Sequence, residues 1–124
     1  MFRLIVGDKF AAAHKLSICG EELHGHNFRV WVTVEGDNLD ANGMVVDLRV
    51  LRGWLTEILK ELDHKYLNDL SYFKMNPPTV ENIAKYIFTN LNRKIPDNLN
   101  LTYVEVWEDE RQGVRYYEGC ATGE

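Results

Sequence analysis

Histidine and cysteine gather near the N-terminus at spacings that suit a metal ion: His14, Cys19, His24 and His26. The run that starts at His24 is apolar at every second position from 28 to 34. A β-strand would therefore place His24 and His26 on the face that these apolar residues turn inward. Two imidazoles on one strand face can converge on one ion, and clustered His and Cys are typical of zinc sites. Metal ligation explains the pair better than two separate hydrogen-bonded core histidines.

His14 is the third candidate ligand, because it ends an earlier alternating segment. That segment runs from residue 2 to residue 14 and is interrupted at Asp8. Two neighbouring strands would then supply three nitrogens and leave one coordination position open, which is the arrangement of catalytic zinc. The alternative is that Cys19 closes the site as a fourth ligand, and the zinc is then structural.

Two amphipathic helices are expected in the middle of the chain. Asp47 is a candidate N-cap for a helix whose apolar residues share one face as far as Leu62. A polar, proline-containing connection follows, and Thr79 is the candidate N-cap of a second helix that Pro96 prevents from continuing.

The remaining chain supplies two further strands, over residues 101–108 and 114–118, across a polar turn. The order of elements is then strand, strand, helix, helix, strand, strand. This order predicts an α+β fold over residues 1–124 as one domain, with an antiparallel four-stranded sheet covered on one face by two helices.

Other polar residues fall at the ends of these elements, where two interpretations compete. Asp63 and His64 follow the first helix, either as a C-terminal cap or as an acid–base pair. Glu108 ends the inward face of its strand, either solvated or aimed at a site. Glu81 lies in the first turn of the second helix, where the helix dipole alone would favour an acid.

Composition excludes several classes of protein. The chain has 124 residues, 45% of them hydrophobic, and a formal net charge of −5 without a basic stripe. Nucleic acid is therefore an improbable partner. No apolar run approaches a membrane span, and the N-terminus lacks a signal-peptide pattern. We expect a cytoplasmic protein with no membrane partner, in which Cys19 and Cys120 are free thiols.

Five segments, in this order, resemble the 6-pyruvoyl-tetrahydropterin synthase and 6-carboxy-tetrahydropterin synthase family. They are Phe10-Ala11-Ala12-Ala13-His14, Cys19 with His24-Gly25-His26, Leu62-Asp63-His64, Pro78-Thr79-Val80-Glu81-Asn82 and Val104-Glu105-Val106-Trp107-Glu108. The resemblance implies the tunnelling fold, in which the sheets of three subunits close into a barrel and two rings usually pair into a hexamer. It also implies a homo-oligomer, trimer or hexamer, with active sites between subunits.

Carried over to this sequence, the resemblance makes the three histidines the ligands of Zn²⁺. Cys19 matches the catalytic thiol, and Asp63 and His64 match the groups that work with it, often from a neighbouring subunit. The family substrate is 7,8-dihydroneopterin triphosphate, and the reaction is triphosphate elimination or side-chain cleavage. Such an enzyme is a zinc-dependent carbon–oxygen lyase of pterin biosynthesis, and one branch leads towards queuosine or archaeosine.

The same resemblance assigns the binding of the substrate's ring. Glu108 matches the glutamate that anchors the pterin, since a carboxylate can accept two N–H bonds from the aminopyrimidine edge. Thr79 and Glu81 lie in a family motif near the pterin pocket.

The spacing between Cys19 and the HGH segment departs from the family. Four residues lie between Cys19 and His24, where the carboxy enzymes usually have three and the animal pyruvoyl enzymes five. A third branch carries a glutamate in place of the cysteine and forms 6-hydroxymethyl-7,8-dihydropterin for folate. This chain has both Cys19 and Glu22, so Glu22 is either a second base or a solvated loop acid.

Two further functions compete with a synthase: a non-catalytic zinc- or pterin-binding module, and an aldolase- or cyclohydrolase-type enzyme.

Overall fold

The computed structural model describes residues 1–16 and 23–119, and it contains one mixed sheet. The order of the strands across the sheet is β3-β1-β2-β4-β5. All neighbours are antiparallel except the short β3, which runs parallel to β1. The strands are β1 (Phe2–His14), β2 (His24–Gly36), β3 (Lys65–Tyr66), β4 (Asn100–Trp107) and β5 (Gly113–Tyr116).

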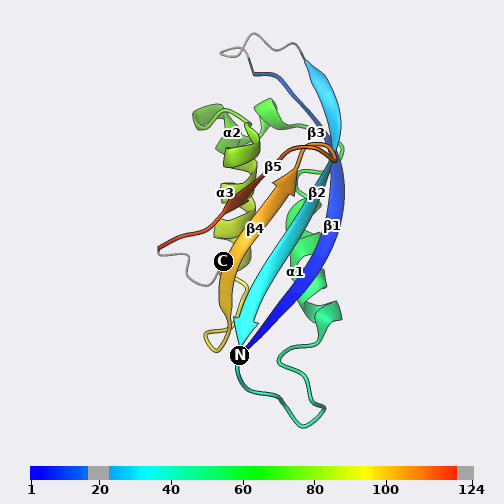
Figure 1. The fold of residues 1–124 in the computed structure, drawn as a ribbon. Helices are drawn as coiled ribbons and strands as arrows, with labels where there is room; N and C mark the ends of the chain where they lie inside the picture. The colour runs from blue at the N-terminus through cyan, green and yellow to red at the C-terminus, as the bar shows by residue number, and fades with distance from the viewer. Residues whose placement is uncertain (17–22, 120–124) are drawn as a thin grey trace.

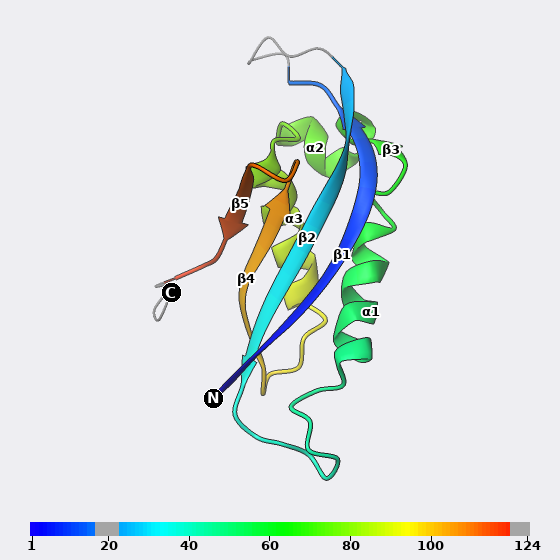
Figure 2. The same ribbon diagram turned by 45° about the vertical axis from the view of Figure 1, so that its right-hand side comes forward.

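Two long helices cover one face of this sheet, and no described helix covers the other face (Figures 1 and 2). They are α1 (Leu48–Leu59) and α3 (Val80–Asn92). Asp47 accepts a hydrogen bond from the Arg49 amide, and Thr79 accepts one from the Asn82 amide, so both expected N-caps are confirmed. Between the helices lie the short η2 (Leu67–Asp69) and α2 (Ser71–Met75).

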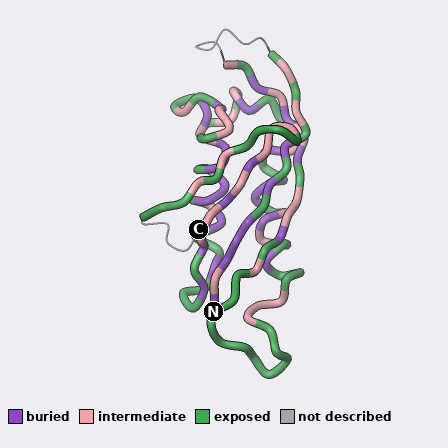
Figure 3. Tube along the Cα trace, in the orientation of Figure 1, coloured by how far each residue is buried: buried purple, intermediate pink, exposed green. Residues whose placement is uncertain are grey.

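The core lies between the two helices and the alternating inward residues of the central strands (Figure 3). Phe10 stacks on Phe28 with ring centroids 4.9 Å apart, directly below the histidine end of β1 and β2. From helix α1, Leu51 and Leu55 are fully buried against this layer. The apolar alternation that continues into His14, His24 and His26 therefore fixes the face on which these side chains lie.

The predicted α+β class is confirmed, but two details were wrong. The sheet has five strands, because β3 adds to the outer edge of β1 through residues that show no apolar alternation. Helix α1 ends at Leu59, and Leu62 reaches the core from the tight turn that follows. Within the described ranges, no helix is both long and apolar enough to cross a membrane.

Candidate metal centre

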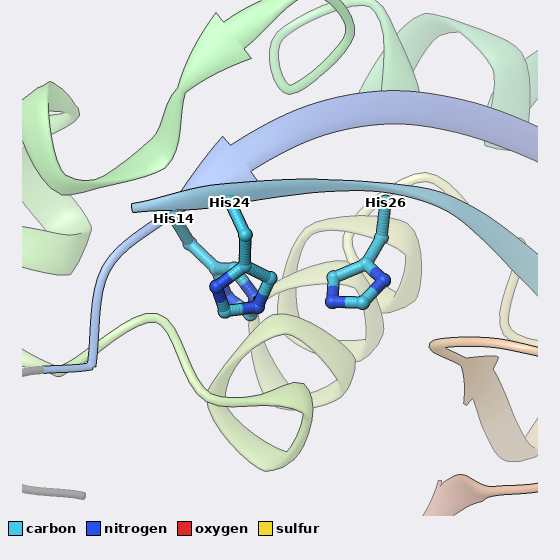
Figure 4. Close-up of side chains that lie close together, drawn as sticks. All are labelled: His14, His24 and His26. Atoms are coloured by element: carbon cyan, nitrogen blue, oxygen red, sulfur yellow. The ribbon is translucent and has the colours of Figure 1, made fainter. Parts of the chain in front are cut away.

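Three histidine side chains meet where β1 ends and β2 begins (Figure 4). In the antiparallel pair, His14 lies opposite His24, and His26 lies opposite Ala12 on the same face. The Nε2 atoms of His14 and His24 are 3.0 Å apart, and the candidate ligand atoms of all three residues lie within 4.8 Å of one another. Zn–N distances of about 2.0–2.1 Å in a tetrahedron require ligand nitrogens about 3.3 Å apart. Small rotations of the side chains would therefore bring the three nitrogens to the distances that a zinc ion requires.

The surroundings of His14 fix which of its nitrogens is available. The residue is fully buried, and its Nδ1 lies 2.7 Å from the carbonyl oxygen of Pro78. A carbonyl only accepts, so Nδ1 carries the proton and donates it, and the Nε2 lone pair points into the cluster. Burial, more than any other influence, lowers the pKa of His14, and the nearby imidazoles lower it further. His14 is therefore held as a neutral ligand with a backbone carbonyl behind it, as metal-bound histidines commonly are.

His26 supplies a nitrogen that lacks a hydrogen bond. Its Nε2 is buried and has no hydrogen-bond partner among the residues that the structure describes. A carboxylate oxygen, Oε1 of Glu108, is 3.0 Å away without the alignment of a hydrogen bond. A buried, unbonded imidazole nitrogen is costly in an apolar site, and a bound metal ion removes that cost.

Together these features fit a zinc ion. Three neutral imidazole nitrogens are a ligand set that zinc favours, and three protein ligands leave a fourth position for substrate or water. The sequence-based prediction that these histidines come together is borne out by their geometry.

A hollow of about 690 Å³ opens beside the cluster at the end of β4. Its lining includes His26 of the histidine cluster with Glu108, and Arg29, Trp31 and Trp107 from the uncovered face of the sheet. The side chain of Glu108 is 18% exposed, so its carboxylate is largely shielded yet reachable from this hollow. A planar ring that enters the hollow would meet a carboxylate a few ångströms from the histidines.

Asp63 and His64 form a pair that is built into the edge of β1. Asp63 accepts a hydrogen bond from the Ala11 amide at 2.9 Å, and the His64 amide donates to the Ala11 carbonyl at 2.6 Å. The His64 Nδ1 lies 2.9 Å from Asp63 Oδ2. His64 has a φ of 59°, an unfavourable conformation for a residue with a side chain, and its ring is 82% exposed. The C-cap of α1 is Lys60, so the interpretation of His64 as a helix cap was wrong.

The charge of Asp63 is stabilised by these contacts. Its hydrogen bond from the Ala11 amide, and then that from His64, lower the pKa of the Asp63 carboxyl below its usual value. The carboxylate therefore stays ionised and orients the imidazole. The ring lines a second hollow with Gly25, Tyr66 and other residues of the uncovered face, on the outside of this chain.

The other predicted site residues are placed as follows. Thr79 uses its hydroxyl to cap α3, and Glu81 is exposed on the first turn of that helix. Cys19 and Glu22 lie outside the described residues. The role of Pro78, whose carbonyl holds His14, was not predicted from the sequence. Every residue has a backbone carbonyl, so the residue type does not indicate which one will accept this hydrogen bond.

Comparisons with known proteins agree in pointing to one family. Residues 3–119 match the family model described as 6-pyruvoyl tetrahydropterin synthase. The chain is 38% identical over 113 residues to the dihydroneopterin monophosphate aldolase of Pyrococcus furiosus, covering 90% of this chain and 94% of that one. It is 42% identical over 95 residues to human 6-pyruvoyl tetrahydrobiopterin synthase, covering 75% of this chain and 65% of the human protein.

The fold is similar to that of a solved enzyme. The structure of Caenorhabditis elegans 6-pyruvoyl tetrahydropterin synthase superimposes with a TM-score of 0.83 at 28% identity, covering 95% of this chain and 96% of the other. The expectation drawn from the five sequence segments is confirmed: this chain belongs to the 6-pyruvoyl tetrahydropterin synthase family.

Proposed function

We propose that this protein is a zinc-dependent pterin synthase that acts on the side chain of 7,8-dihydroneopterin triphosphate. The observation that carries the proposal is the cluster of His14, His24 and His26, next to a shielded carboxylate in an open hollow. Bound zinc would act as a Lewis acid on the hydroxyl oxygens of the substrate's side chain. The rest of the chemistry falls to protein groups.

Two kinds of group supply the proton transfers. Cys19 is the proposed base, because a thiolate beside a cation has a lowered pKa and accepts a proton readily. Asp63 and His64 pass a proton to or from the adjacent carbon. The outward-facing ring of His64 supports a role in the site of a neighbouring subunit.

Glu108 is the proposed anchor of the pterin ring. Its carboxylate lies within 3.0 Å of His26 Nε2, so a ring bound there would hold its side chain beside the metal ligands. A carboxylate accepts two parallel N–H bonds from an aminopyrimidine edge, which fixes the ring's direction as well as its position. Thr79 and Glu81, which the family motif would place near the pterin pocket, lie on the segment that also carries Pro78.

A second candidate reaction is favoured by the archaeal relative, whose name is that of an aldolase acting on a dihydroneopterin monophosphate. A base would remove the proton of the side chain's 2′-hydroxyl, and the C1′–C2′ bond would break. The electron pair would pass to C1′ and the conjugated ring, which then takes up a proton. The products would be 6-hydroxymethyl-7,8-dihydropterin and glycolaldehyde phosphate. Glu22, as a base of different reach from Cys19, is the residue that we assign to this branch.

The proposed assembly is a ring of subunits whose sheets close into a barrel, as a trimer or a pair of trimers. The outer edge of β1 supports it, because the contacts of β3 and its flanking residues with β1 begin at Ala11, and the part of β1 before Ala11 has no strand along that edge among the described residues.

The proposed function is tested by mass spectrometry of the products formed from the triphosphate and from the monophosphate. A synthase gives a 6-pyruvoyl or 6-carboxy product from the triphosphate, and an aldolase gives the hydroxymethyl product.

Cys19→Ala should lower pyruvoyl or carboxy product formation by roughly 100-fold or more. Glu22→Ala should remove only the hydroxymethyl product. Failure of the wild type to change either substrate would overturn the proposal, and an unaltered product set in Glu22→Ala would make Glu22 a solvated loop acid.

A further inference from the structure

A group of three cationic side chains lies where the uncovered face of the sheet meets α1 beside β1. Lys9 of β1 and Arg29 of β2 are exposed, and Arg52 reaches the same place from α1. They line a hollow of about 220 Å³ together with Gly7, Asp8 and Trp31. The whole chain carries a net charge of −5, so this local excess of positive charge runs against the overall balance.

The positions of Lys9 and Arg29 are unfavourable without a ligand. The two residues are direct partners in the β1–β2 register, so their side chains leave the same face side by side. Like charges directly opposite one another destabilise a sheet. In the described part of the chain, no carboxylate forms an ion pair with Lys9, Arg29 or Arg52, whereas Arg3, Arg49 and Arg115 each have one.

The one acid in the lining is already engaged by other donors. Asp8 accepts a hydrogen bond from the Thr56 hydroxyl at 2.6 Å and one from the Lys9 amide at 2.8 Å. Three cations and one carboxylate leave an excess of two positive charges. A doubly charged oxyanion would neutralise this excess.

Trp31 gives the hollow one wall. A Cβ on Gly7 would lie 2.5 Å from the Trp31 ring, so the absence of a side chain at Gly7 lets the indole lie against β1. The indole ring therefore forms an apolar wall of the hollow beside Lys9 and Arg29.

We propose that Lys9, Arg29 and Arg52 form a binding site for phosphate groups. Arginine presents paired N–H donors to phosphate oxygens, and lysine adds a mobile positive charge. The chemistry specifies a phosphate ester or polyphosphate, either as the tail of the substrate or as a separate anion.

The two lining residues that this hollow shares with the larger one favour the substrate's own phosphates. Arg29 and Trp31 line this hollow and also the larger one that contains His26 and Glu108. His26 and Arg29 leave opposite faces of β2, but both line the larger hollow. The strand advances by on the order of 10 Å between them, a length that a polyphosphate side chain can span. This assignment to the substrate rests on the proposed function, but the binding of phosphate does not.

Binding is tested by titration calorimetry of the purified full-length protein with sodium tripolyphosphate. We expect saturable binding by the wild type, and affinities roughly tenfold or more weaker in Arg29→Gln and in Arg52→Gln, since each loses charge-assisted hydrogen bonds. Arg93→Gln is the matched control, because Arg93 is an exposed arginine at the C-terminal end of α3. Thermal melting of each variant checks that the fold is intact.

The outcomes distinguish the existence of the phosphate site from its role in binding the substrate. Absent binding by the wild type, or equal affinity in the folded variants and the wild type, would overturn the site. A raised KM of Arg29→Gln for dihydroneopterin triphosphate, with no change for unphosphorylated dihydroneopterin, would support the substrate's phosphates as the occupant. Weakened tripolyphosphate binding with an unchanged KM would overturn that assignment and leave a separate anion. A wild type that binds tripolyphosphate yet turns over no pterin would contradict the proposed function alone.

Discussion

The nitrogen that His14 offers to a metal is decided by the carbonyl of Pro78, far along the chain. His14 Nδ1 donates to that carbonyl, and burial favours the neutral ring. The sequence predicted the three histidines because strand alternation carries them to one face. It did not predict the Pro78 contact, or the distance of 3.0 Å between Glu108 and His26, because both depend on how the helices and the end of β4 pack against the sheet.

Replacement of Glu108 by Gln should weaken substrate binding without releasing zinc. The amide keeps the size of the side chain but loses the charge that strengthens hydrogen bonds to ring N–H groups. We expect KM for the pterin substrate to rise roughly 10- to 100-fold, with the zinc content unchanged. Steady-state kinetics and elemental analysis measure the two quantities. Glu110→Gln, in the same hollow but exposed, is the control, and an unchanged KM in Glu108→Gln would remove the anchoring role.

The pH dependence of stability should reveal the contact of Asp63 with β1. Its folded-state pKa is lowered, first by the Ala11 amide and then by His64, from a usual value of 3.8. The stabilisation is therefore complete above that value and is lost as the pH falls through the lower folded-state pKa. In urea unfolding, the gap in midpoint between wild type and Asp63→Asn should be widest near neutral pH and should narrow below pH 3.8.

The exposed Asp69 on η2 offers a control for this experiment. Asp69→Asn should not reproduce the pH-dependent gap. A gap of constant size between wild type and Asp63→Asn across this range would show that the ionised Asp63 carboxylate adds nothing to the fold.

At the scale of elements, some helices and strands depend on local sequence and others on tertiary contacts. The caps of α1 and α3 and the long strands could be predicted, because each depends on a short run of residue types. The two-residue β3 could not, since Lys65 and Tyr66 form a strand only through their pairing with Ala12 and Ala13. In η2, which follows β3, the side chain of Asn68 forms hydrogen bonds with both the amide and the carbonyl of Lys15. The segment that contains β3 and η2 therefore stays beside the chain past His14.

The N-cap of α3 should influence the metal site, and the N-cap of α1 should not. Thr79 begins α3 next to Pro78, whose carbonyl holds His14. Both Thr79→Ala and Asp47→Ala should cost about 1 kcal/mol of stability, the usual cost of a lost cap. Only Thr79→Ala should also weaken zinc binding, measured by competition with a chelator. Equal zinc affinity in the two variants would separate the start of α3 from the metal site.

At the scale of the whole molecule, no described helix covers one face of the sheet, and the part of β1 before Ala11 has no described strand along its outer edge. The face carries exposed Trp31, and the ring of His64 points outward beside it. A single chain thus exposes part of its proposed catalytic machinery on its outer surface. The sequence could predict this only through family resemblance, because alternation tells which face of a strand is apolar and not what covers the other face.

Mixing of inactive subunits should restore activity if the site is shared. Cys19→Ala and His64→Ala each remove one proposed proton-transfer group, so mixed rings would contain sites with both groups intact. We expect partial recovery of product formation after the two variants are dissociated and reassembled together. Reassembly of each variant alone is the control. No recovery, once mass spectrometry has shown exchange of subunits, would place both groups in one chain's site.

The central claim is that His14, His24 and His26 bind a catalytic metal ion, and the zinc content of the purified protein tests it most directly. Elemental analysis should find about one zinc per chain in the wild type, as three imidazoles and one open position imply. The double variant His24→Ala/His26→Ala should hold almost none while remaining folded. His64→Ala, which removes the remaining histidine, should keep its zinc. An equal zinc content in the wild type and the double variant would contradict the account.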